Sequence, residues 1–195
     1  MTKIFATFIL VFITLNLFSQ EINKNSYGIS IGAGETGIST KEGIIGGPGY
    51  SALPNIEAGL NYYHPLIKKV YFESGLYWHY NKIKITPNFY PGIDLTPKYY
   101  NCNLLYVPLN LKVMFSKYFF IYGGFLFNAD ISQNSYISNQ TGIGTDFGFG
   151  VEIPVLKHYS ISISPYVNIN GLYKFNRQDL NESLISDGIR ITIKK

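Results

Sequence analysis

Hydrophobic and polar residues alternate along most of the chain after residue 20, with the period of two that is typical of β-strands. The alternation is clearest in residues 146–153, DFGFGVEI, and in residues 160–164, SISIS. One face of each stretch is apolar, and the other face is small or polar. The pattern therefore predicts strands that separate an apolar environment from a polar one.

Eight such stretches are predicted, and the connections between them are alternately long and short. The strands are expected at Ser26–Gly34, Asn55–His64, Val70–Ile85, Tyr99–Phe115, Tyr118–Ser132, Gly142–Pro154, Tyr159–Tyr173 and Ser183–Lys194. The four longer connections, 35–54, 86–98, 133–141 and 174–182, all fall at one end of the strands. Short periplasmic turns and longer extracellular loops are typical of outer-membrane barrels. The sequence therefore predicts an all-β fold, an eight-stranded antiparallel up-and-down transmembrane β-barrel.

The first 20 residues have the features of a secretory signal peptide. Lys3 precedes an apolar run, Ile4–Phe18, and Ser19 offers a small residue for cleavage. The run is shorter than the roughly 20 residues that a spanning helix needs, which disfavours an uncleaved anchor. We expect a signal peptide at 1–20 and one barrel domain at 21–195, exported to the outer membrane of a Gram-negative cell envelope.

Parity within each strand divides the residues into two faces. The apolar face, expected to contact outer-membrane lipid, includes Ile56, Leu60, Leu76, Phe125, Phe147, Ile163 and Ile191. The opposite face carries acidic, basic and amide residues, which are costly in a dry interior unless they are paired. Since eight strands enclose little more than side chains, we predict a polar network that fills a narrow lumen. Its members are expected to be Glu57, Glu73, Asn110, Lys112, Asp130, Asp146, Glu152 and Arg190.

Aromatic residues near the strand ends are expected to form a girdle at each membrane surface. Tyr62, Phe72 and Phe119 lie near the turn ends, and Trp78 and Tyr80 lie near the loop ends. The loop 86–100 is rich in aromatic and proline residues, a composition that favours binding. Its candidate contacts with a protein partner are Phe89, Tyr90, Tyr99 and Tyr100. The alternative is that this loop folds over the barrel mouth and plugs it.

Composition agrees with a membrane barrel. The chain is 46% hydrophobic and only 14% charged, with 17 Tyr, 14 Phe and 19 Gly. The net charge of +4 comes from scattered lysines without a basic stripe, so a nucleic-acid partner is not expected. Cys102 is the single cysteine and cannot form an internal disulfide. We expect a monomer without a cofactor.

Several segments resemble the outer-membrane β-barrel domain family of Bacteroidota, the porin-family or PorT-like proteins. The similar segments are NIEAGLNYY at 55–63, ESGLY at 73–77, LYVPLNLK at 105–112, YGGF at 122–125 and DFGFGVE at 146–152. The chain departs from many outer-membrane barrels in its last residues, ITIKK, which lack a terminal aromatic residue. The resemblance implies a location and a shape rather than an activity, because fold does not imply function.

Motifs for chemistry are weak. The segment 32–37, GAGETG, matches a dinucleotide-binding fingerprint, but no helical pattern follows it. His64 and His158 are expected at turns and His79 near the opposite rim, so they cannot form one metal site. A lipid-modifying enzyme would need His79 to act with Ser132, Ser135 or Asp130, and no motif marks a nucleophile among them.

We therefore expect a non-enzymatic structural or binding barrel with a narrow, plugged lumen, acting through its external loops or a partner. Besides the lipid-modifying enzyme, two alternatives remain. A small porin would have a similar sequence pattern. A soluble lipocalin-like carrier would alternate equally well, but with its apolar face inward.

Overall fold

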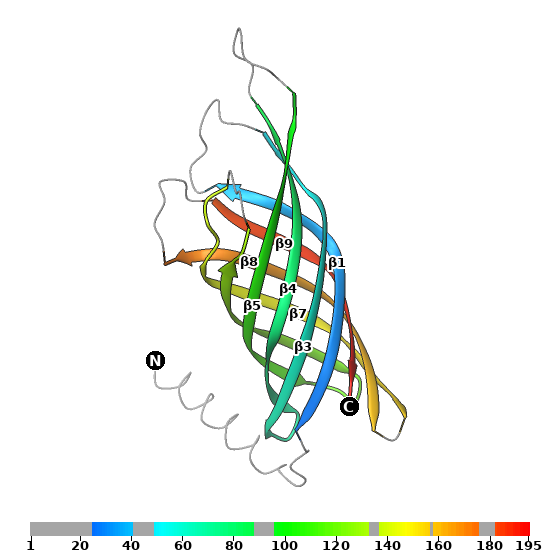
Figure 1. Ribbon diagram of the computed structural model, residues 1–195. Coiled ribbons are helices and arrows are strands. Elements are labelled where there is room, and N and C mark those ends of the chain that lie inside the picture. The colour runs from blue at the N-terminus through cyan, green and yellow to red at the C-terminus, as the bar shows by residue number, and fades with distance from the viewer. Residues whose placement is uncertain (1–24, 41–48, 88–95, 133–136, 157, 176–181) are drawn as a thin grey trace, which may run out of the picture.

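The computed structural model describes residues 25–40, 49–87, 96–132, 137–156, 158–175 and 182–195 (Figure 1). The predicted signal peptide lies outside these residues. Within them lie nine β-strands: β1 (Ser26–Thr40), β2 (Gly49–Ser51), β3 (Leu53–Ile67), β4 (Val70–Thr86), β5 (Lys98–Met114), β6 (Phe119–Asp130), β7 (Gly142–Leu156), β8 (Tyr159–Lys174) and β9 (Glu182–Lys194).

All strands except the short β2 close into a ring in the order β1–β3–β4–β5–β6–β7–β8–β9 and back to β1. Every neighbouring pair in the ring is antiparallel. The ring closes between β1 and β9, where the Tyr27 amide donates to the Lys195 carbonyl at 3.0 Å and the Lys195 amide donates to the Tyr27 carbonyl at 2.8 Å. The predicted fold class, an eight-stranded antiparallel up-and-down barrel, is confirmed.

The two ends of the barrel differ in their connections. The turn end holds the β3–β4, β5–β6 and β7–β8 connections, all short, and Lys69 in the first of these has a left-handed backbone with φ of 69°. The loop end holds the longer connections, those that follow β1, β4, β6 and β8. The N-terminal end of β1 and the C-terminal end of β9 both lie at the turn end (Figure 1).

The predicted loop 35–54 is partly wrong. Strand β1 continues to Thr40, where it pairs with the start of β9, and β2 forms within the same segment by pairing with the end of β4. Local composition there, rich in Gly and Ser, disfavours a strand. The neighbouring strands outweigh this local preference, because their free backbone groups form hydrogen bonds with those of β1 and β2.

Burial is inverted relative to a water-soluble domain. Phe125 and Ile29 on the outer wall are each 63% exposed, whereas Arg190 inside is only 3% exposed. The exposed wall is dominated by Ile, Leu, Val and Phe, and the buried face by Asn, Ser, Tyr and charged residues. In the described part of the chain, no helix is both long and apolar enough to cross a membrane.

Strands β4 and β5 form a hairpin that rises well beyond the rest of the barrel (Figure 1). At its base the pairing of β5 with β6 stops at Leu104 and Asp130, while the pairing of β4 with β5 continues to Ile85 and Lys98. On the other side β2 pairs with Lys84–Thr86 of β4. The upper part of this hairpin is therefore a small sheet that stands clear of the barrel wall.

Candidate functional site

The centre of the lumen is occupied by the guanidinium of Arg190 on β9. Its Nε lies 2.5 Å from Oε1 of Glu57 on β3, and its Nη2 lies 3.3 Å from Oε2 of the same carboxylate. Nη1 lies 3.5 Å from Oδ2 of Asp146 on β7. Asp146 also accepts a hydrogen bond of 2.8 Å from the amide of Asn110 on β5. This arrangement satisfies a buried arginine with two carboxylates, one of them bidentate.

Four tyrosines surround the same guanidinium. Arg190 donates to the hydroxyl of Tyr122 at 3.1 Å and to that of Tyr106 at 3.2 Å. Its Cζ lies 4.9 Å from the ring centroid of Tyr77 and 4.6 Å from that of Tyr166. The rings of Tyr77 and Tyr106 stack at 4.9 Å. The residues around Arg190 thus form a packed central layer across the barrel.

Glycines on the inner wall make room for these rings. A Cβ at Gly59 would lie 2.4 Å from the Tyr77 ring, and one at Gly148 would lie 2.5 Å from the Tyr122 ring. Real Cβ atoms do not approach so closely, so only glycine leaves space for the tyrosines at these two positions. The glycine content of the sequence has a structural role here.

A second charged group lies nearer the turn end. Lys112 on β5 contacts Glu152 on β7 at 2.8 Å, and Lys194 on β9 forms an ion pair with the same carboxylate. The Lys112 ammonium lies 3.8 Å from the ring centroid of Phe120. Glu73 on β4 accepts a hydrogen bond of 3.2 Å from Asn61. The turn end is therefore also filled by paired polar side chains.

Above the central layer lies a level of amides and hydroxyls. Thr36 donates to Asn81 at 2.6 Å and accepts from Asn55 at 2.9 Å. Both here and in the central layer, some buried side-chain nitrogens or oxygens have no hydrogen-bond partner among the described residues. They belong to His79, Asn81, Asn110, Asn128, Asp146, Asn168 and Asn170. Buried polar atoms of this kind are suited to ordered water.

An apolar cluster lies at the loop end of the lumen, and it is called the apolar plug below; it consists of Ile83, Cys102, Leu104, Ile137 and Leu184. Ile137 comes from the β6–β7 connection, whose residues 137–140 lie against β9. The Ser138 amide donates to Oε2 of Glu182 at 3.1 Å, and the Leu184 amide donates to Oε1 of Gln140 at 3.3 Å. The side chain of Lys174 donates to the Ser138 hydroxyl.

The structure brings most of the predicted lumen residues to the inside of the barrel. Seven are buried or nearly so and paired as described above: Glu57, Glu73, Asn110, Lys112, Asp146, Glu152 and Arg190. Asp130 differs, because its carboxylate lies at the loop end and accepts backbone hydrogen bonds from Ser132 at 3.0 Å and Gln140 at 3.1 Å. It fixes the connection that supplies the plug and takes no part in the charged layers.

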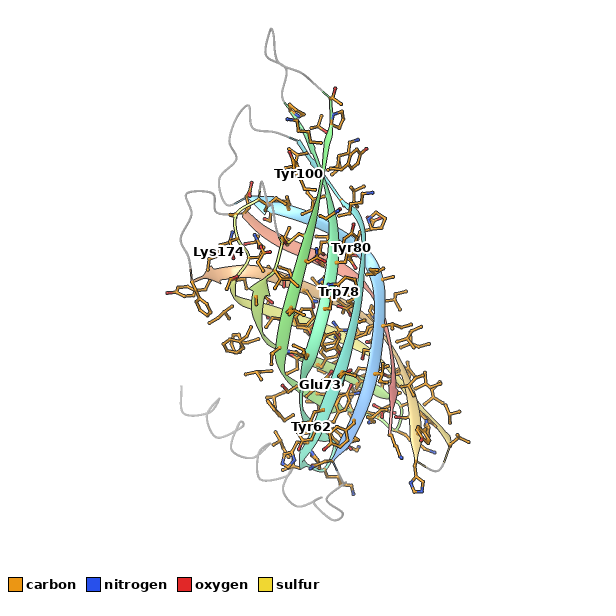
Figure 2. All side chains as sticks on the ribbon, in the orientation of Figure 1. Tyr62, Glu73, Trp78, Tyr80, Tyr100 and Lys174 are labelled. Atoms are coloured by element: carbon orange, nitrogen blue, oxygen red, sulfur yellow. The ribbon has the colours of Figure 1, made fainter. Side chains whose placement is uncertain are left out.

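The predicted girdle residues all lie on the outward parity of their strands. Figure 2 shows Tyr62 near the turn end and Trp78 and Tyr80 well above it. Phe119 packs on Phe115 at 6.0 Å between ring centroids, and Tyr62 packs on Tyr27 at 5.4 Å. Phe72 lies opposite His64 and Leu111 in the neighbouring strands.

The loop predicted to contact a partner is described only at its base. Phe89 and Tyr90 lie outside the described residues, Tyr99 is 58% exposed and Tyr100 is half-buried. The described flanks of this loop rise away from the barrel mouth (Figure 2), and among the described residues it is Ile137 of the β6–β7 connection that joins the apolar plug. Sequence reasoning missed this plug, because a short loop segment has no periodicity. It also missed the tyrosines that point into the lumen. Tyr77 has the same parity on β4 as Glu73 and His79, and this parity was the signal that could have placed it inside the barrel.

The residues considered for lipid-modifying chemistry are not joined. Among the described residues, no hydrogen bond links His79 to Ser132 or Asp130, and Ser135 lies outside them. The Ser132 hydroxyl instead accepts from the Asn103 amide at 2.9 Å. No group of three or more histidine, cysteine or acidic residues in the described part of the chain is placed to hold a metal ion.

Comparison with known proteins finds no matching family model and no matching curated protein. Several solved structures are similar in fold. OprG of Pseudomonas aeruginosa has a TM-score of 0.44 at 12% identity, over 89% of this chain and 99% of that one. Ail of Yersinia pestis has a TM-score of 0.36 at 12% identity, over 89% and 100%. The translocator domain of the autotransporter NalP from Neisseria meningitidis has a TM-score of 0.37 at 9% identity, over 97% and 94%. Likenesses at this level carry no argument about function, and the PorT-like resemblance stays a prediction.

Proposed function

We propose that this protein is an integral outer-membrane β-barrel whose lumen is closed and whose work is done at its loop end. The observation that carries the proposal is the inverted burial: the outer wall exposes Leu60, Phe125 and Phe147, while Arg190 and Glu57 are buried inside. In water such a wall would be an extreme apolar patch, whereas in a bilayer it is the favourable surface. A lipocalin-like carrier would need the opposite arrangement.

A closed lumen is supported by the side chains that fill three of its levels. The Lys112–Glu152 pair lies nearest the turns, the Arg190 layer occupies the centre and the apolar plug closes the mouth. Eight strands leave space for little more than these side chains. A small porin would need a continuous wet path through all three levels, so we infer a barrel that does not conduct ions steadily.

The loop end offers a contact surface on the projecting hairpin. Lys82 and Lys84 follow Tyr80 on the outward face of β4, opposite Asn101 and Tyr99 of β5. The Lys82 ammonium lies 5.6 Å from the Tyr99 ring centroid, and the Tyr80 hydroxyl donates to Asn101 at 2.9 Å. Exposed aromatic and basic side chains held together in this way favour binding of an acidic partner.

The hairpin also has an unpaired strand edge within the described residues. Asn103 directs both backbone groups toward the β6 side, since its amide donates to Ser132 and its carbonyl accepts from Ile131 at 3.0 Å. Backbone direction alternates along a strand, so Asn101 and Tyr99 direct their backbone groups to the same side, beyond the end of β6. An extended acidic segment of a partner protein can pair there by strand addition.

The membrane proposal is tested by refolding residues 21–195 into detergent micelles and phospholipid vesicles. We expect a gel band that shifts on boiling, resistance to extraction by alkaline carbonate, and no steady conductance in a planar bilayer. A chain that stays in solution without detergent would overturn the barrel proposal. Discrete channel steps would overturn the closed lumen and favour the small porin.

The partner surface is tested by photocrosslinking in the native host, with a crosslinking amino acid at Tyr99 and, as the control, at Tyr173, which is equally exposed at the loop end. We expect an adduct from Tyr99 alone. Asn101→Pro removes the outward amide and should abolish it, whereas Asn101→Ala should not. Adducts of equal yield from both positions would contradict the hairpin surface, and an adduct with a second copy would assign the edge to self-association.

A further inference from the structure

A groove of about 600 Å³ lies on the outer wall at the turn end of the barrel, where β1 and β9 close the ring. It is lined almost entirely by apolar and aromatic side chains, chiefly Tyr27, Ile29, Leu60, Tyr159, Ile191 and Ile193, with Lys195 at its end. In Figure 1 this region lies where the C-terminus is flanked by β1 and by the β7–β8 hairpin. The groove is separate from the lumen and from the loop-end surface.

The length of the groove matches one leaflet of a bilayer. Its lining follows β1 from Tyr27 to Ile31, which is about 13 Å along a strand at ~3.3 Å per residue. The hydrocarbon core of a bilayer is roughly 30 Å thick, so one leaflet contributes about half of that. Because barrel strands are tilted by about 35–45°, the groove covers roughly 10 Å of this depth, which is most of one leaflet.

The rim of the groove carries positive charge beside an aromatic residue. The Lys195 ammonium lies 5.8 Å from the ring centroid of Tyr159. Lys68, Lys69 and Lys117 are also exposed at the turn end. Glu152 on β7 is already paired with two lysines inside the barrel. An apolar groove that ends beside exposed ammonium groups complements a lipid with a negatively charged headgroup.

We propose that this groove is a binding site for an anionic phospholipid of the periplasmic leaflet, with one acyl chain along the outer face of the β1–β9 seam and the phosphate at Lys195. The proposal rests on the proposed function, because it requires the wall to face a membrane. The occupant covers the seam where Ile29 and Ile193, which are register partners, are 63% and 53% exposed.

The test uses a single-tryptophan reporter in the groove, Trp78→Phe with Tyr159→Trp, refolded into vesicles. Phosphatidylglycerol with brominated acyl chains is compared with brominated phosphatidylcholine at equal mole fraction, and quenching of the reporter is measured. We expect at least about twofold more quenching by phosphatidylglycerol at low mole fraction. Lys195→Gln should remove this preference, since it removes the charge that meets the phosphate.

Two matched variants separate the groove from the general lipid surface. Ile191→Phe fills the groove and should reduce quenching by phosphatidylglycerol, whereas Ile121→Phe, on the outer wall of β6, should leave it unchanged. Equal quenching by the two lipids in a heat-modifiable barrel would overturn the groove and keep the membrane barrel. Absence of quenching by either lipid, together with absence of a heat-modifiable band, would overturn both. A dimer whose formation is blocked by Ile191→Phe would assign the groove to a second copy and overturn the lipid.

Discussion

Glu57 and Arg190 form an ion pair across Gly32, on the lumen side of the strand that separates theirs. Gly32 of β1 is the register partner of Glu57 on β3 and also of Arg190 on β9, so the three residues form one row across adjacent strands. A Cβ at Gly32 would lie 2.7 Å from both Cγ and Oε1 of Glu57. The missing side chain in the middle of the row thus lets two charged groups from non-adjacent strands pair.

Breaking this pair should destabilise the barrel strongly. Glu57→Gln leaves Arg190 buried with only the more distant carboxylate of Asp146, and removing one member of a buried pair costs about 3–5 kcal/mol. The free energy of unfolding is measured by urea titration of the heat-modifiable band. The double variant Glu57→Gln with Arg190→Met should recover part of the loss. Additive losses would contradict direct coupling of the two groups.

Gly32→Ala should also destabilise the fold, because the new methyl group collides with the Glu57 side chain. Overpacking of this kind costs about 1–3 kcal/mol. Gly37→Ala on the same strand is the matched control, since a Cβ there meets nothing within 4 Å. The two variants are compared by urea unfolding in the same detergent. Equal stability of the two would mean that the row adjusts without the glycine.

An arginine at the middle of the outer wall should be far more costly than one near the rim. Leu76 lies between Phe72 and Tyr80 on β4, and Leu66 lies near the turn end; the two are 53% and 50% exposed. In a bilayer Leu76→Arg should cost about 2–4 kcal/mol and Leu66→Arg about 0–1 kcal/mol. Unfolding from vesicles, followed by Trp78 fluorescence, measures both. A similar small cost at both positions would be inconsistent with a wall that spans lipid.

The apolar plug should protect the single cysteine. Cys102 is 2% exposed within it, so the folded protein should react slowly with a maleimide. Ile137→Ala removes packing worth about 2 kcal/mol or more, which should speed labelling by roughly tenfold or more if local opening limits it. Ile131→Ala, an exposed position at the same end, is the control and should label like the parent chain. Fast labelling of the parent would show that the plug does not close the mouth.

Alternation along the strands was sufficient to assign Glu57, Lys112 and Arg190 to one face, because a period of two fixes which side of a sheet each residue occupies. It could not pair Arg190 with Glu57 rather than with Glu152. Which residues share a level depends on the stagger between strands, and stagger is set by the closed ring as a whole. The glycine at position 32 likewise does not indicate, from sequence alone, that Glu57 and Arg190 lie on either side of it.

The plug and the rise of β1 to Thr40 lay beyond sequence reasoning for a different reason. Both depend on partners distant in the chain. The Leu184 amide donates a hydrogen bond to the Gln140 side chain, and Thr40 is the register partner of Glu182. Local residues there give a loop pattern, and only the neighbouring strand converts them to ordered structure. The same holds for β2, whose three residues are a strand only because β4 lies beside them.

The β1–β9 seam has a consequence for the order of events in folding. The first strand of the barrel finds its second partner in the last one, along a register that runs from Gly28–Lys194 to Thr40–Glu182. Until β9 pairs with β1, one whole edge of β1 remains unpaired, and an unpaired strand edge can associate with other chains. Closing this contact requires the most distant pairing in the sequence, which is slow to form. The interval before closure is therefore when the chain most needs shielding from other copies of itself.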